Sequence, residues 1–499
     1  MKSTFFRIAA LIVIVVALLG MIWSPAWWLY LLIIPVLLLG LWDFFQTGHT
    51  IRRNFPVIGN FRYMLEGIGP ELHQYFIENA TDGTPINRTQ RRYVYSRAKR
   101  EHQVHPFGTE LDVLKTGYAY LPHSIYPAKV MSPAPRIRIG GPHCTQPYDA
   151  SVFNISAMSY GSLSQQAITA LNIGAREGGF YHCTGEGGIS PYHLQGGDLV
   201  FQIGTGYFGA RSPEGGFSPE RFRENALRPE VKMIELKLSQ GAKPGHGGIL
   251  PAAKNNEEIA AIRGVVPHTE VDSPPYHTAF NGPMGLLEFI HQLRDLAEGK
   301  PVGFKLCIGS REEFITLCEL MEQTGLRPDY IAVDGAEGGT GAAPVDFSNH
   351  VGVPLEEGLV FVVDTLERHN LKSDIRVVAA GKVITAFDIF HTLAVGADLC
   401  SSARGMMLAL GCIQALECHL NTCPTGIATN NPRLTRGLVV ADKWERVRNY
   451  QQETVKDFLD LVAAAGITDL EQVDRTKLYK RISPEEVRRF DALHPAGGR

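Results

Sequence analysis

The sequence has no excess of charge of either sign, no low-complexity tract and no short internal repeat. Its 499 residues include 48 Lys and Arg against 51 Asp and Glu. A nucleic-acid-binding surface needs clustered positive charge, so nucleic acid is not an expected partner. The length is sufficient for one large α/β domain with appendages, or for two or three smaller domains.

Charge is also absent from two long apolar runs near the N-terminus, residues 8–23 and 26–42. Each run is at the short end of the ~17–25 residues that a helix needs to cross a bilayer. Tryptophans mark the turn between the runs: Trp23, Trp27 and Trp28. Basic residues flank the pair: Lys2, Arg7, Arg52 and Arg53. We therefore expect a two-helix hairpin in the cell membrane with the catalytic body in the cytoplasm; the alternative is a cleaved signal peptide.

Composition predicts four segments along the chain. The membrane hairpin occupies residues 1–46, and a polar and aromatic helical collar follows at 47–130. The main domain is expected at 131–438, and a charged helical extension at 439–499.

The main domain contains eight short apolar runs rich in β-branched residues, several of them followed by a glycine-rich loop and a helical pattern. They lie at residues 153–158, 178–183, 199–204, 231–237, 302–308, 330–335, 375–381 and 397–402. Strands that alternate with helices predict a parallel sheet, and eight units predict a closed (β/α)8 TIM barrel. An open doubly wound sheet is the alternative. In a barrel, the functional groups are expected at the C-terminal ends of the strands.

Glycine-rich loops follow the last three of these runs. Consecutive glycines let backbone N–H groups converge on an anion, and the loops after strands seven and eight are the usual phosphate site of this barrel. The candidate residues are Gly338, Gly339, Thr340, Gly381, Ala403 and Arg404. A phosphate at this place, with the other strand ends free above it, suits flavin mononucleotide (FMN).

Three charged groups stand out at other strand ends, namely Glu186, Lys243 and Arg263. Two cations can bind a dicarboxylate, and a nearby carboxylate can bind ammonium or move protons. Lys305 lies within the apolar run at 302–308. A cation at this place, near a flavin ring, would stabilise the anionic reduced form of the flavin. By contrast, residues 204–209 match the dinucleotide pattern G-x-G-x-x-G, but no helix pattern follows, so we interpret the match as a loop.

Three of the eight cysteines are gathered in "GCIQALECHLNTCP" as Cys412, Cys418 and Cys423. A reducing cytoplasm disfavours disulfides. Three thiolates without a fourth suit an iron–sulfur cluster with an open corner, such as [3Fe–4S]. Zinc with His419 as a further ligand and three buried structural cysteines are the alternatives.

Five motifs in this order resemble the flavin-and-cluster domain of glutamate synthases. They are "SAMSYGSLS", "TGEGG", "QGAKPGHGGILP", "DGAEGGTGAAP" and "GCIQALECHLNTCPTGIAT", and the resemblance covers about residues 155–429. With the hairpin and collar, the chain looks most like the stand-alone, membrane-tethered glutamate-synthase-like proteins of bacteria.

The resemblance implies FMN, a [3Fe–4S] cluster on the three cysteines, and reduction of 2-iminoglutarate, formed from 2-oxoglutarate and ammonia, to L-glutamate. It places Ala157, Met158 and Ser159 against the flavin and Lys305 near its ring. It assigns Lys243 and Arg263 to 2-oxoglutarate and Glu186 to the reacting nitrogen.

Departures from the family pattern put the substrate in question. The family loop usually reads G-E-G-G-Q-L-P, whereas His246 and Ile249 replace its Glu and Gln here. No glutaminase domain with an N-terminal Cys and no NAD(P)H-binding region is apparent, so an external electron donor such as ferredoxin or a reductase is expected. A different amino or keto acid as substrate, or a non-catalytic membrane-anchored subunit, are the alternative functions.

Overall fold

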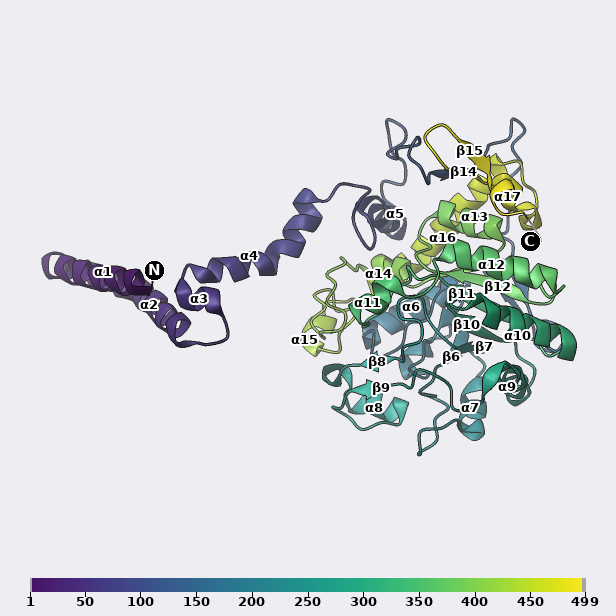
Figure 1. Ribbon diagram of the computed structural model, residues 1–499, viewed down its shortest axis with the longest axis horizontal. Helices are drawn as coiled ribbons and strands as arrows, with labels where there is room; N and C mark the ends of the chain where they lie inside the picture. Colours follow the sequence, from purple (N-terminus) through teal and green to yellow (C-terminus); the bar gives the residue numbers. More distant parts are fainter. Residues whose placement is uncertain (1, 496–499) are drawn as a thin grey trace. The chain divides into compact units, whose positions relative to one another are not determined.

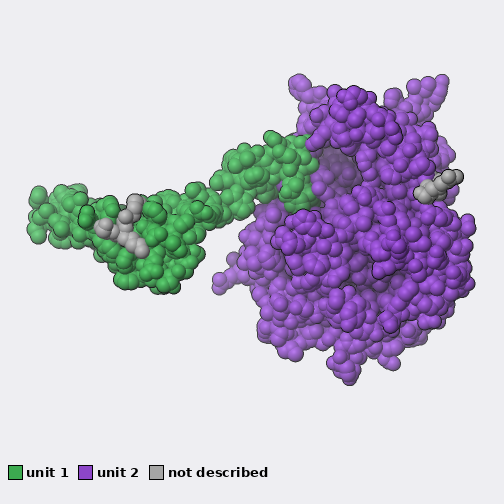
Figure 2. Space-filling model, viewed as in Figure 1, with its two compact units in different colours: residues 1–88 green, residues 89–499 purple. Residues whose placement is uncertain are grey.

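The computed structural model describes residues 2–495, and the chain forms two compact units, residues 1–88 and 89–499 (Figures 1 and 2). The predicted division into four segments stays a prediction.

The first unit begins with two apolar helices, α1 (Lys2–Ile22) and α2 (Tyr30–Phe45), joined by the short helix η1 (Ser24–Leu29). By length and composition alone, Thr4–Ile22 and Ser24–Phe45, the latter formed by η1 and α2 together, are each able to span a bilayer, although a signal sequence meets the same criteria. The buried Asp43 side chain accepts hydrogen bonds from Val57 N at 2.9 Å and Asn60 Nδ2 at 2.5 Å, which ties the end of α2 to the chain that follows. That chain forms α3 (Thr50–Asn54), α4 (Gly59–Leu72) and η2 (His73–Ile77).

The second unit is built on a closed barrel of eight parallel strands (Figure 1). The strands are β4 (Phe153–Ile155), β5 (His182–Cys183), β6 (Leu199–Ile203), β7 (Val231–Lys237), β10 (Val302–Leu306), β11 (Tyr330–Asp334), β12 (Arg376–Ala380) and β13 (Leu399–Ser402). Each lies within one of the eight predicted runs. The predicted TIM barrel is therefore confirmed, and the open-sheet alternative is wrong because β13 pairs with β4 and closes the sheet.

Helices cover the outside of the barrel between the strands. They are α6 (Gln165–Gly178), α7 (Pro219–Ala226), α9 (Gly282–Leu296), α10 (Arg311–Thr324), α12 (Leu355–Arg368), α13 (Ala386–Val395) and α14 (Arg404–Leu410). Caps fix several of these helix starts: Ser164 Oγ accepts from Ala167 N, and Ser310 Oγ accepts from Glu313 N. A long excursion between β7 and β10 adds the two-stranded sheet of β8 (Ile249–Leu250) and β9 (Val271–Asp272), together with α8 (Glu257–Arg263).

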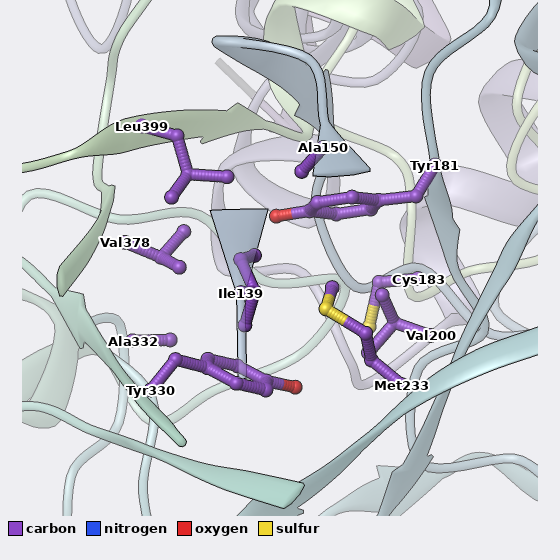
Figure 3. Packing of buried hydrophobic residues seen from close by; sticks show 10 residues of the cluster. All are labelled: Ile139, Ala150, Tyr181, Cys183, Val200, Met233, Tyr330, Ala332, Val378 and Leu399. Atoms are coloured by element: carbon purple, nitrogen blue, oxygen red, sulfur yellow. The ribbon is translucent and has the colours of Figure 1, made fainter. Parts of the chain in front are cut away.

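A hairpin outside the eight predicted runs closes the N-terminal end of the barrel. Its strands are β2 (Ile137–Ile139) and β3 (Tyr148–Ala150), and Ile139 and Ala150 pack on buried residues of the barrel (Figure 3). The barrel residues of this cluster are Tyr181, Cys183, Val200, Met233, Tyr330, Ala332, Val378 and Leu399. Both tyrosine hydroxyls form hydrogen bonds inside the barrel. Tyr330 Oη donates to Ile234 O at 2.9 Å, and Tyr181 Oη shares a hydrogen bond with Ser401 Oγ at 2.7 Å.

One buried ion pair fastens this end of the barrel. Asp329 accepts hydrogen bonds from Arg294 Nε at 3.0 Å, Val302 N at 2.7 Å and Gly141 N at 2.8 Å. The side chains of Arg294 and Asp329 are 3% and 1% exposed. The carboxylate therefore joins α9, β10 and the loop of the hairpin in one network.

We expect Arg294→Met to lower the free energy of unfolding by about 3–5 kcal/mol, because it leaves the Asp329 carboxylate buried without its cation. Chemical denaturation of the full chain measures this loss. Arg223→Met is the matched control: Arg223 pairs with Glu298 at 2.6 Å, but both side chains are about half exposed, so the loss should stay below about 1 kcal/mol. Equal losses of unfolding free energy in the two variants would contradict the stabilising role of the buried Arg294–Asp329 ion pair.

The C-terminal extension is helical at first, as predicted. Helix α16 (Val440–Ala464) packs against α6, where Gly174 leaves room for Val447. The end of the chain then adds β14 (Tyr479–Arg481) and β15 (Val487–Arg489), which form a small sheet with β1 (Ala119–Tyr120) that the sequence did not predict.

Candidate active site

The barrel mouth, defined as the C-terminal ends of the eight strands and the loops that follow them, brings together the predicted site residues. The turn of Ala157, Met158 and Ser159 follows β4 directly. The loop after β5 packs closely on this turn at Gly185, which has a φ of +66°. A Cβ atom added at Gly185 would lie only 2.7 Å from Ser159 N. Glycine is required at this position by both conformation and space.

Glu186 follows Gly185 and forms an ion pair with Lys237 Nζ at 2.6 Å. Lys237 is the last residue of β7, and its Nζ also donates to Gln240 Oε1 at 2.6 Å. Burial raises the pKa of Glu186, but Lys237, Lys243 and Arg263 act in the opposite direction and the net result is a lowered pKa. Glu186 is therefore a carboxylate held among three cations.

Two glycines make room for this carboxylate. A side chain at Gly204 would collide with Glu186 Oε2, and one at Gly248 would lie 2.8 Å from its Oε1. Gly204 is the first glycine of the G-x-G-x-x-G match, and Gly209 packs on Gly188. The segment that follows forms turns and no helix begins until Pro219, so the interpretation of this motif as a loop is confirmed.

Lys243 is a buried cation whose ammonium group makes no hydrogen bond with the described part of the chain. It is 3% exposed. Burial and the nearby Lys237 lower the pKa of Lys243 to about 8, while Glu186 and Asp272 act to raise it. A buried lysine without a hydrogen-bond acceptor is costly, so this group is suited to an anionic ligand.

Arg263, the last residue of α8, is also buried, and one of its nitrogens lacks a partner in the described residues. Its Nη2 donates to Tyr160 O at 3.1 Å and to Ser159 Oγ at 3.4 Å, whereas Nε has no acceptor. The guanidinium lies over the Phe208 ring at 5.1 Å. Burial lowers the pKa of Arg263 to about 10, with Glu186 acting in the opposite direction.

Lys305 points into the barrel interior and pairs with Asp334 Oδ2 at 3.2 Å. Burial lowers the pKa of Lys305, but Asp334 and Glu235 outweigh it and the net pKa is raised. Glu235 in turn accepts from Gln202 Nε2 at 2.6 Å. Lys305 is therefore a cation secured below the mouth.

The loops after β11, β12 and β13 meet at the predicted phosphate site. Gly381 has a φ of +130°, and a side chain there would lie 2.9 Å from Gly335 N. A side chain at Gly339 would lie 2.8 Å from Arg404. Arg404 Nη2 donates to Glu337 O at 2.5 Å. The other predicted residues of this site, Gly338, Thr340 and Ala403, are on the same loops, and Thr340 Oγ1 donates to Ala342 O at 3.3 Å.

Two cations, Lys382 and Arg404, belong to the loops that meet at this place. The pKa of Lys382 is lowered by burial and by Arg404, and that of Arg404 is lowered by burial. Cations whose charges disfavour one another are suited to hold an anion between them. The sequence analysis did not select Lys382, although it follows Gly381 directly and lies in the same loop.

Two further residues of the mouth were missed. Lys237 is the last residue of its predicted run at 231–237, whereas Lys305 was selected as a cation within an apolar run. His277 Nε2 lies 2.8 Å from Lys237 O, and its Nδ1 lies 3.2 Å from Tyr207 Oη. No motif marks His277, because the residues that it contacts, Tyr207 and Lys237, are distant from it in the sequence and only the fold brings them together.

The three clustered cysteines lie on the loop between α14 and the short helix α15 (Pro432–Thr435). Burial raises the pKa of the Cys412 thiol to about 11, and Cys418 and Cys423 raise it further through their charges. Burial and Cys423 also raise the pKa of Cys418. Burial is the first cause of both shifts, and the three cysteines share one loop.

Within residues 2–495, no group of three His, Cys, Asp or Glu side chains lies close enough to hold a single metal ion. A cluster is larger than an ion, and its ligands stand further apart. Three thiols on one loop are a donor set that fits a cluster, and the exposed His419 belongs to no group in the described residues that could hold a single ion.

A buried cation lies beside this cysteine loop. Burial lowers the pKa of Lys254 to about 8, and the thiols of Cys418 and Cys423 act to raise it. The sequence analysis gave no role to Lys254.

The loop after β7 contains His246 and leads to Ile249, the two residues that depart from the family pattern. The ring of His246 packs on Phe347 with the centroids 5.3 Å apart, and its Nδ1 lies 2.9 Å from Gly247 O. Ile249 begins β8 and is partly buried opposite Asp272.

Comparison with known proteins places the chain in a family. The model of the conserved region in glutamate synthase matches residues 143–468. The glutamate synthase large subunit-like protein YerD of Bacillus subtilis is 40% identical over 464 residues, which is 85% of this chain and 88% of that protein. The archaeal glutamate synthase [NADPH] of Methanocaldococcus jannaschii is 31% identical over 321 residues, 64% of this chain and 60% of that protein.

Among solved structures, a mandelate oxidase mutant with benzaldehyde has a TM-score of 0.45 at 14% identity, covering 85% of this chain and 98% of that one. Nothing about activity follows from that likeness. The family match spans most of the barrel and every residue of the mouth described above. The chain belongs to the glutamate synthase family and is an oxidoreductase of that type.

Proposed function

We propose that the chain reduces 2-iminoglutarate, formed from 2-oxoglutarate and ammonia, to L-glutamate with the help of FMN and a [3Fe–4S] cluster. The observation that carries this proposal is the set of charges at the barrel mouth. Lys237, Lys243 and Arg263 surround one carboxylate, Glu186, and leave an excess of buried positive charge. A dicarboxylate of matching charge would neutralise that excess.

The residues at the mouth fit FMN. Lys382 and Arg404 would hold its phosphate beside Gly381, where a side chain would fill the space that the phosphate loop needs. Lys305 would lie toward the ring, and Ala157, Met158 and Ser159 would face it. When bound, FMN supplies the hydride that reduces the imine carbon. The chain contributes position and charge.

Cys412, Cys418 and Cys423 would hold the [3Fe–4S] cluster. Their shared loop and their mutual influence on pKa support this assignment. The cluster would supply electrons one at a time from an external donor, for which we propose ferredoxin or a reductase.

Each charged side chain of the mouth has a distinct task in this proposal. Arg263, with its unpartnered Nε, and Lys243 bind the two carboxylates of 2-oxoglutarate and fix the carbon to be reduced. Glu186 binds ammonium or a proton at the reacting nitrogen, and Lys237 holds Glu186 in place. Gly204 and Gly248 keep the carboxylate accessible by leaving space around it.

A second candidate substrate is another amino or keto acid. The apolar Ile249 replaces a family glutamine beside the substrate, and a lost polar partner costs ~1–3 kcal/mol of binding. We also propose that α1 and α2 anchor the chain in the cell membrane with the barrel in the cytoplasm. Their length, apolar composition and basic flanks support this location.

Titration of the reduced protein tests the proposed reaction. The full chain is purified, reduced without oxygen and mixed with 2-oxoglutarate and ammonium together, while flavin absorbance is followed. We expect rapid reoxidation and L-glutamate in the mixture, and neither with 2-oxoglutarate or ammonium alone.

Different outcomes separate the alternatives. Reoxidation by another keto acid with ammonium, but not by 2-oxoglutarate, would favour the second substrate. A colourless protein without flavin or cluster would contradict the proposal and favour a non-catalytic membrane-anchored subunit.

A further inference from the structure

Lys254 links two loops that the proposed reaction needs to hold near each other. It ends the short helix η4 (Ala252–Lys254) and is 3% exposed. Its Nζ donates to Ser162 O at 2.7 Å and to Cys418 O at 3.1 Å. Ser162 belongs to the loop that begins with the proposed flavin-facing turn, and Cys418 is a proposed cluster ligand.

The backbone of the same segment reinforces the link. Ala253 O accepts from Asn421 Nδ2 at 2.9 Å, and Lys254 O accepts from Asn430 Nδ2 at 3.1 Å. Asn430 Nδ2 also donates to Gly161 O at 3.2 Å. Three loops, after β4, after β8 and after α14, are therefore joined in one hydrogen-bond network with the Lys254 ammonium at its centre.

A buried cation at this place has an electrostatic consequence. Reduction of a cluster adds negative charge, and a fixed positive charge nearby favours the state with more negative charge. The low local dielectric of a buried site strengthens the effect. Removing the charge would therefore make reduction harder.

We propose that Lys254 is a positioning residue for the cluster, which holds the cysteine loop against the flavin-facing loop and raises the reduction potential of the cluster. The proposal rests on the proposed function for the existence of the cluster. Lys254 is not itself a proposed ligand. It would act through its hydrogen bonds to Ser162 O and Cys418 O and through its positive charge.

The test is a redox titration of the purified full chain with its cofactors, followed by the electron paramagnetic resonance signal of the cluster. Lys254→Met should retain flavin and cluster, but its equilibrium constant for cluster reduction should fall about tenfold, which is 59 mV for one electron. Lys254→Arg keeps the charge and should stay within about threefold of the unchanged chain.

Lys300→Met is the matched control. Lys300 Nζ likewise donates to backbone carbonyls, those of Ala226, Arg228 and Val231, but it lies near the N-terminal end of the barrel. Its loss should leave the potential of the cluster unchanged.

Each outcome decides for or against the proposal. A potential in Lys254→Met equal to that of the unchanged chain would overturn it. Loss of the cluster in Lys254→Met, with retention in Lys254→Arg and Lys300→Met, would support the positioning role. Equal damage in Lys254→Met and Lys300→Met would overturn the proposal as a general loss of folding. Absence of a cluster in the unchanged chain would instead overturn the proposed cofactor, a result visible without any measurement of glutamate formation.

Discussion

Glu186→Gln is expected to lower kcat for reductive amination by about 10²- to 10⁴-fold, the range that a positioned proton-transfer group contributes. The substitution keeps the shape of the side chain but removes the negative charge that lies among Lys237, Lys243 and Arg263. Steady-state rates of glutamate formation at saturating 2-oxoglutarate and ammonium measure the loss. Flavin absorbance should be retained, because the phosphate loops lie elsewhere in the mouth.

Glu258→Gln provides the control for this prediction. Glu258 is also a carboxylate that accepts hydrogen bonds, from Tyr192 Oη at 2.8 Å and from Tyr160 Oη at 2.5 Å, but it makes no ion pair with the three cations in the described residues. We expect its kcat to stay within a few fold of the unchanged chain. A Glu186→Gln variant as active as this control would remove Glu186 from the proposed mechanism.

Cys418→Ser is expected to abolish the cluster signal in both visible absorbance and electron paramagnetic resonance. A serine hydroxyl replaces one of the three proposed thiolate ligands, and no other thiol in the described chain shares their loop. Without the cluster, electrons from an external one-electron donor would lose their proposed path to the flavin. Glutamate formation with such a donor should therefore fall below detection. Flavin content should persist.

Cys144→Ser tests whether the effect is specific to the cysteine loop. Cys144 is partly exposed near the N-terminal end of the barrel, and its Sγ donates to Gly299 O at 3.3 Å, a bond that serine is able to keep. The cluster signal should be unchanged in this variant. An unaltered signal in Cys418→Ser would falsify the ligand assignment.

The barrel itself was predictable because its signal is local. Each of the eight strands lies in one of the short, mostly apolar runs that were predicted as strands, and a parallel strand that is covered on both faces is expected to be apolar. The hairpin of β2 and β3 was not predicted, since its strands have three residues each and derive their stability from packing on the barrel (Figure 3). The β1–β14–β15 sheet joins segments more than 350 residues apart, which no local pattern reveals.

The candidate site divides in the same way. Glu186, Lys243 and the glycines were visible in the sequence because they cluster in motifs at strand ends. Lys254 and His277 were not, because each is an ordinary residue in its own segment. Lys254 contacts Cys418, which is 164 positions away in the sequence, and His277 contacts Lys237, which is 40 positions away.

The closure of one end of the barrel by β2 and β3 has a consequence for kinetics. With that end filled by Ile139 and its neighbours, the groups described at the mouth are approached from the mouth side. In the proposed reaction, the amino acid formed and the incoming keto acid would therefore occupy the same place in turn. The amino acid should then act as a competitive inhibitor against the keto acid.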